Sequence, residues 1–134
     1  MRPRAGLFCA LVLLLVHSKE VLAADPNLII LTPKNGSALH PDPKRGPVVV
    51  VKYEVKNFTV VGFTGVPTVS EREGHVHIWL DEDPPSFTHT ASDVWVYNRV
   101  APGEHTLTLE LVRRNHTPLK HPVKRSVRFT MTAE

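Results

Sequence analysis

Residues 74–81 read Gly-His-Val-His-Ile-Trp-Leu-Asp, and apolar side chains alternate with polar or aromatic ones along this stretch. Such alternation is typical of a β-strand, because successive side chains of a strand point to opposite faces of its sheet. A strand with one apolar face needs a second layer to cover it. The core-facing side chains would be Val76, Ile78 and Leu80, and the other face would carry His75, His77 and Trp79.

The same two-residue period recurs between turn signals rich in proline, glycine and asparagine. No window shows the 3.6-residue period and the caps of a helix. Seven short strands in one chain of domain size predict an all-β fold, an immunoglobulin-like antiparallel β-sandwich, with a small barrel as the alternative. Besides 74–81, we expect strands at 28–31, 48–55, 58–63, 94–97, 105–111 and 124–131, and loops at 40–47, 65–74 and 82–91.

The first 23 residues have the features of an export signal. Arg2 and Arg4 precede an apolar run at 7–16, and Val21 and Ala23 stand at the −3 and −1 positions of a small-residue cleavage site. The apolar run has about ten residues, whereas a helix that crosses a bilayer needs about 20. We expect residues 1–23 to be a cleaved signal peptide. Residues 24–134 would then be an exported domain, periplasmic or extracellular, without a stable membrane anchor.

Removal of this signal changes the charge balance. The whole chain has 16 Lys and Arg against 13 Asp and Glu, a net charge of +3. Residues 24–134 keep 13 basic and 12 acidic residues, so the basic excess belongs mostly to the signal. A nearly neutral domain argues against a nucleic-acid partner. The only cysteine, Cys9, also lies in the signal, so the exported domain can form no disulfide and its stability must come from its core.

Signatures of enzymes are sparse in this chain. It has no nucleophile elbow, no His-Glu-x-x-His zinc motif and no phosphate-binding glycine loop. The acidic run 81–83 follows a strand and precedes two prolines, a setting typical of a solvated loop rather than of paired catalytic acids. We therefore expect no catalytic activity, and a metalloenzyme is the third of three hypotheses.

Histidine is the distinctive residue of the exported domain, and His75 and His77 are its sharpest pair. Side chains at i and i+2 of a strand share a face, about 6–7 Å apart. Two imidazoles so placed can bind one transition-metal ion, and neutral imidazole suits copper and zinc. His89 in the following loop is a candidate third ligand, and Asp81 or Asp83 could add an oxygen. The first hypothesis is therefore binding of copper, or else zinc, through His75, His77 and His89.

The other histidines predict different roles. His105 is in phase with Leu107 and Leu109, so we expect it to be partly buried and hydrogen-bonded near a strand end. We expect His40, His116 and His121 to be solvated loop residues.

Aromatic residues form a second candidate site. If the strands that hold Trp79 and Trp95 are neighbours, then Trp79, Trp95 and Tyr97 share a face with the two paired histidines. Exposed aromatic rings can bind a partner protein or a glycan, or they can simply pair across strands and stabilise the sheet. The alternative hypothesis is therefore a non-catalytic module that binds another exported protein or a glycan. Three triplets also match the N-glycosylation sequon, at Asn35, Asn57 and Asn115.

Residues 74–83, Gly-His-Val-His-Ile-Trp-Leu-Asp-Glu-Asp, and residues 102–105, Pro-Gly-Glu-His, carry a family resemblance. With residues 45–49 and 53–57 they resemble a family of small exported bacterial proteins of unknown function. The resemblance covers most of 24–134 and implies an immunoglobulin-like domain without an established activity. His75-Val76-His77 is also similar, over a few residues, to the copper-ligand strand of copper-zinc superoxide dismutases, which implies a type of site rather than common descent.

Overall fold

The computed structural model describes residues 23–62, 69–82, 86–88 and 94–133. Residues 1–22 lie outside this part, so the division into a signal peptide at 1–23 and a domain at 24–134 stays a prediction. The described elements are all strands: β1 (Asn27–Thr32), β2 (Ser37–Leu39), β3 (Val48–Lys56), β4 (Thr59–Val60), β5 (Glu73–Leu80), β6 (Ser86–Thr88), β7 (Val94–Asn98), β8 (Gly103–Arg113) and β9 (Pro118–Met131). Within these ranges no helix is long and apolar enough to cross a membrane.

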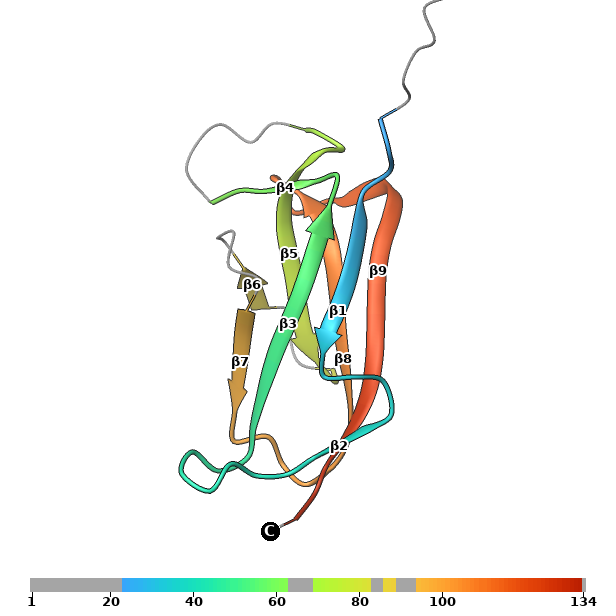
Figure 1. The fold of residues 1–134 in the computed structure, drawn as a ribbon. Helices are drawn as coiled ribbons and strands as arrows, with labels where there is room; N and C mark the ends of the chain where they lie inside the picture. Colours follow the sequence, from blue (N-terminus) through green and yellow to red (C-terminus); the bar gives the residue numbers. More distant parts are fainter. Residues whose placement is uncertain (1–22, 63–68, 83–85, 89–93, 134) are drawn as a thin grey trace, which may run out of the picture.

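The strands form two sheets that pack face to face (Figure 1). The smaller sheet has the order β1-β3-β7, and the larger has the order β2-β9-β8-β5-β4, with β6 beside β5. All pairs are antiparallel except two short ones at the margins of the larger sheet, β2 with β9 and β4 with β5. The predicted all-β, immunoglobulin-like sandwich is therefore confirmed.

The core between the two sheets contains the side chains that the alternation places inward. Fully buried apolar residues come from both sheets, and each stabilises the fold by about 1.5–3 kcal/mol when it leaves water. The largest contributors are Leu28, Val49, Val51, Tyr53, Val76, Ile78, Leu107, Leu109, Leu111, Phe129 and Met131.

The structure corrects the expected strands at four places. Strand β9 begins at Pro118 rather than at 124, so His121 lies on a strand and not in a loop. The expected strand 58–63 is reduced to β4, Thr59–Val60. The expected loop 82–91 contains β6, which pairs with β5 through Val76 and Thr88. Strand β2 was not expected. Strands of two or three residues show no sequence period, because they are too short for one, and they form by pairing with a longer strand that is already in place.

Candidate functional site

His75 and His77 lie on the outer face of the larger sheet, as the alternation predicts. In the pairing of β5 with β8, His75 stands opposite Val112 and His77 opposite Glu110. The preceding Gly74 allows a close approach of the two strands, since a Cβ at this position would lie 1.9 Å from the carbonyl oxygen of Val112.

His75 is buried, with 1% of its surface exposed, and the backbone engages both of its ring nitrogens. Nδ1 lies 2.9 Å from the carbonyl oxygen of Val61, and Nε2 lies 3.3 Å from that of Arg114. This histidine therefore ties the segment after β4 and the end of β8 to the start of β5.

His116 joins this pair from the turn between β8 and β9. Its φ of +62° belongs to a tight turn, which Asn115 stabilises by accepting hydrogen bonds from the backbone and hydroxyl of Thr117. The His116 ring stacks on His75 with centroids 4.8 Å apart, and its Nδ1 lies 3.1 Å from Nε2 of His77. We call His75, His77 and His116 the three-histidine cluster.

Ion pairs hold the turn that carries His116. Nε of Arg113 donates to Glu71, which also accepts the backbone N–H of Lys120 at 2.8 Å. Arg114 lies 3.3 Å from Glu73. The bond from the Lys120 backbone and the Arg113 guanidinium hold the pKa of Glu71 below its usual value, against the opposing effect of burial. Both pairs fix the end of the β8–β9 hairpin beside β5.

Electrostatics favour the neutral form of His116. Burial lowers the pKa of its ring, and the neighbouring His75 lowers it further. A neutral imidazole keeps one nitrogen lone pair, which is the form that binds metal ions.

The predicted metal ligands are therefore only partly brought together. His75 and His77 share a face, but the ring that meets His77 is His116, which we had expected to be solvated. His89 and Asp83 lie outside the described residues, so their roles stay predictions. Within the described ranges, no group of three or more His, Cys, Asp and Glu side chains is arranged to hold a metal ion. The antiparallel register brings the end of β8 to the start of β5, but the sequence does not show that the turn folds back over the sheet.

Asp81 and His105 meet at the other end of β5. His105 Nδ1 lies 2.7 Å from the Asp81 carboxylate, and Nε2 lies 2.8 Å from the Ala101 carbonyl. The expectation that His105 is partly buried and hydrogen-bonded is confirmed. Asp81 binds this ring and therefore does not join the three-histidine cluster.

The shared aromatic face required that the strands of Trp79 and Trp95 be neighbours, and this condition is not met, because the two strands belong to different sheets. Trp79 lies on the outer face of the larger sheet, where Lys124 Nζ stands 4.7 Å from its ring centroid. Trp95 and Tyr97 belong to β7, which pairs with β3 in the smaller sheet, and they pack partly buried against the core. The chain changes sheets between β6 and β7, so Trp79 and Trp95 are not on neighbouring strands.

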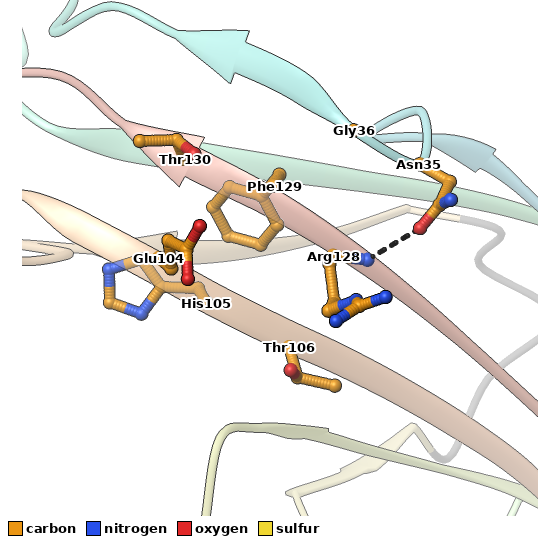
Figure 2. A pocket seen from close by; sticks show the side chains of 8 residues that line it. All are labelled: Asn35, Gly36, Glu104, His105, Thr106, Arg128, Phe129 and Thr130. Atoms are coloured by element: carbon orange, nitrogen blue, oxygen red, sulfur yellow. Dashed lines mark hydrogen bonds between the residues drawn. The ribbon is translucent and has the colours of Figure 1, made fainter.

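A polar hollow of about 510 Å³ lies on the larger sheet near the end of β9 (Figure 2). The turn before β2 forms one wall, where Asn35 accepts a hydrogen bond of 2.9 Å from the backbone of Arg128. Strands β8 and β9 supply the remaining lining, through Glu104, Thr106, Arg128 and Thr130. These residues come from three segments that are far apart in the sequence, so the hollow was not predicted.

The two-layer antiparallel architecture places this chain among the immunoglobulin-like β-sandwich modules. A family model described as a family of unknown function (DUF6130) matches residues 17–133, and the chain belongs to that family. Among solved structures, the chain is similar to the fibronectin(III)-like modules of Clostridium thermocellum CbhA. The identity is 16% and the TM-score 0.54, and the match covers 78% of this chain and 94% of that one. No curated protein matches the sequence. The resemblance to a family of unknown function with this fold is thus confirmed.

Proposed function

We propose that this protein is an exported, non-catalytic β-sandwich that binds a copper(II) or zinc(II) ion through His77 and His116. The distance of 3.1 Å between Nε2 of His77 and Nδ1 of His116 carries the proposal. Imidazole nitrogens bind such ions at about 2.0–2.1 Å, so two that share an ion at right or tetrahedral angles lie about 2.9–3.4 Å apart. The observed separation falls in this interval.

His75 supports this pair rather than serving as its second ligand. Both of its ring nitrogens face backbone carbonyls, and its ring packs against His116. Contacts of this kind orient the ligands of metal sites. The predicted pair His75–His77 is thus replaced by His77–His116, with His75 as a positioning residue.

A site with two protein ligands suits reversible metal handling. Structural zinc sites are closed by four protein ligands, whereas a two-histidine site leaves positions for water or for a donor from another molecule. We therefore expect moderate affinity and a role in holding or passing on metal ions outside the cytoplasm.

Calorimetric titration with copper(II) and zinc(II) tests the proposal. We expect micromolar binding by the wild-type protein and affinity at least about tenfold lower in His77→Gln and in His116→Gln. His121→Gln is the matched control, because His121 is exposed on β9 and outside the cluster. The absence of micromolar binding, or binding that both cluster variants retain, would overturn the proposal.

A second measurement separates metal binding from a simple hydrogen bond between the two rings. In the free protein, one ring of the pair donates a proton to the other. A shared metal ion needs the lone pairs of both facing nitrogens, so the bridging proton must move to the other nitrogen of the ring that donated it. Nitrogen-15 NMR of the histidine rings with and without zinc(II) detects this change of tautomer, and ring signals of His77 and His116 that zinc leaves unchanged would contradict the proposed ligands.

A further inference from the structure

His105 lies at the opposite end of β5 and β8 from the three-histidine cluster. It projects inward from β8, and its ring stacks on the buried Phe129 of β9 with centroids 5.4 Å apart (Figure 2). The side chain is 11% exposed, so the protein surrounds most of the ring.

Both ring nitrogens of His105 face oxygen atoms that can only accept. Nδ1 is 2.7 Å from the Asp81 carboxylate, in the turn after β5, and Nε2 is 2.8 Å from the Ala101 carbonyl, in the turn before β8. A neutral imidazole has one N–H and can donate to one of these oxygens, whereas the protonated ring donates to both. The geometry therefore matches the protonated ring.

The two contacts of the ring join the turn after β5 to the connection before β8. Asp81 also exchanges backbone and side-chain hydrogen bonds with Thr106, at 2.7 and 2.8 Å. Next to Ala101, the buried Val100 donates its N–H to Pro47 at 3.0 Å. The ring of His105 thus bonds the turn after β5 and the β7–β8 connection, and this connection is itself bonded to the residue before β3.

We propose that His105 is a pH-sensitive latch, which bonds both the turn at Asp81 and the connection at Ala101 when its ring is protonated and gives up one of these two bonds when the proton leaves. The proposal is independent of metal binding at the other end of the sheet.

The charges around the His105 ring determine whether the latch stabilises the protein at lower or at higher pH. Burial by itself lowers the pKa of His105, but the bonds to Asp81 and Ala101 and the Asp81 charge outweigh it and raise this pKa above its ordinary value. Glu82 belongs to the same turn as Asp81, and Glu104 and Arg128, with opposite charges, border the hollow beside the ring. Because this pKa is raised, the stability that the His105 ring contributes is fully present below about pH 6.5. This contribution is lost as the pH rises through the pKa of His105 in the folded protein.

Nitrogen-15 NMR of the histidine rings and thermal unfolding between pH 5.5 and 8.5 test the latch. We expect the His105 ring to titrate above about 6.5, the value of a model peptide. We expect the melting temperature of His105→Gln to lie below that of the wild type at pH 6, and the gap to narrow by pH 8.5. His40→Gln is the matched control, because His40 bonds the hydroxyl of Thr132, which serves a neutral ring equally well.

Two further readouts keep the test independent of whether His105→Gln folds. In Asp81→Asn, the amide can donate to the ring, so the titration midpoint of His105 should fall. Amide exchange of Val100 and Thr106, corrected for its intrinsic pH dependence, should accelerate as His105 deprotonates. A ring that titrates at or below the model value, or wild-type and His105→Gln melting temperatures that change in parallel, would overturn the proposal.

Discussion

Gly74 shows how one residue can set the distance between two strands. A Cβ built on it would lie 1.9 Å from the carbonyl oxygen of Val112, a contact that only a shift of the backbone can relieve. The close approach that it allows leads directly into His75 and hence into the three-histidine cluster.

We predict that Gly74→Ala destabilises the fold by about 1–3 kcal/mol, the usual cost of forcing extra atoms into a packed site. Chemical denaturation measures this loss. Gly46→Ala is the comparison, because a Cβ at position 46 meets nothing within 4 Å. Only the positive φ of +75° opposes that substitution, and this conformation costs a residue other than glycine about 1–2 kcal/mol. A neutral effect of Gly74→Ala would show that β5 and β8 are farther apart than described.

Glu71 provides a second prediction at this scale. The Lys120 backbone and the Arg113 guanidinium lower its pKa, so its contribution to stability is present above the ordinary value of 4.5 and is lost as the pH falls through the lower folded value. We expect Glu71→Gln to be less stable than the wild type at pH 7, by about 1 kcal/mol or less because the carboxylate is partly solvated. Unfolding curves at pH 7 and pH 3 check this, and a gap that persists at pH 3 contradicts it.

At the scale of the element, aromatic and aliphatic side chains alternate along β7, and the aromatic ones face the core. Trp95 packs against the core, whereas Val94 and Val96 are 37% and 45% exposed. On β7 the aromatic rings therefore pack against the core, and the aliphatic side chains of Val94 and Val96 face the solvent.

We predict that Trp95→Ala costs about 2–4 kcal/mol, since it removes a large, partly buried ring. Val96→Thr should change stability by less than about 0.5 kcal/mol, as is usual for surface positions. Denaturant titration of both variants tests the orientation of the strand, and a larger loss for Val96→Thr would mean that the two faces of β7 are reversed.

At the scale of the whole molecule, one core joins both sheets, and Leu109 lies fully buried within it. The fluorescence of the two tryptophans can show whether both sheets unfold together, because Trp79 belongs to the larger sheet and Trp95 to the smaller. A domain of this size is expected to unfold in a single cooperative step.

We predict coincident unfolding transitions for Trp79→Phe and Trp95→Phe, each followed by the fluorescence of the remaining tryptophan. Adding Leu109→Ala should shift both transitions together by about 2–5 kcal/mol. Separate midpoints would show that the two sheets are stabilised independently.

The sequence predicted the long strands and their core faces because alternation is a local property. Val76, Ile78 and Leu80 were assigned inward from eight neighbouring residues, and they are buried. The pairing of strands is non-local, and for this reason the sequence could not decide whether Trp79 and Trp95 lie on neighbouring strands; they lie in different sheets. The position of His116 depends on a turn with positive φ that folds back over β5, and no period in the sequence reports such a turn. His105 was predictable because its environment follows from the phase of its own strand.

The parallel pairing of β2 with β9 has a consequence for the order in which the chain folds during synthesis. Ser37 pairs with Phe129, and Leu39 with Met131, so the larger sheet joins an early segment to its last strand. Contacts between segments so distant in sequence make folding slow, because a long loop must close before they form. Strand β8 can pair with β5 before β9 is made, but β2 has no partner in the larger sheet until β9 follows, so this sheet is completed only by its last described strand.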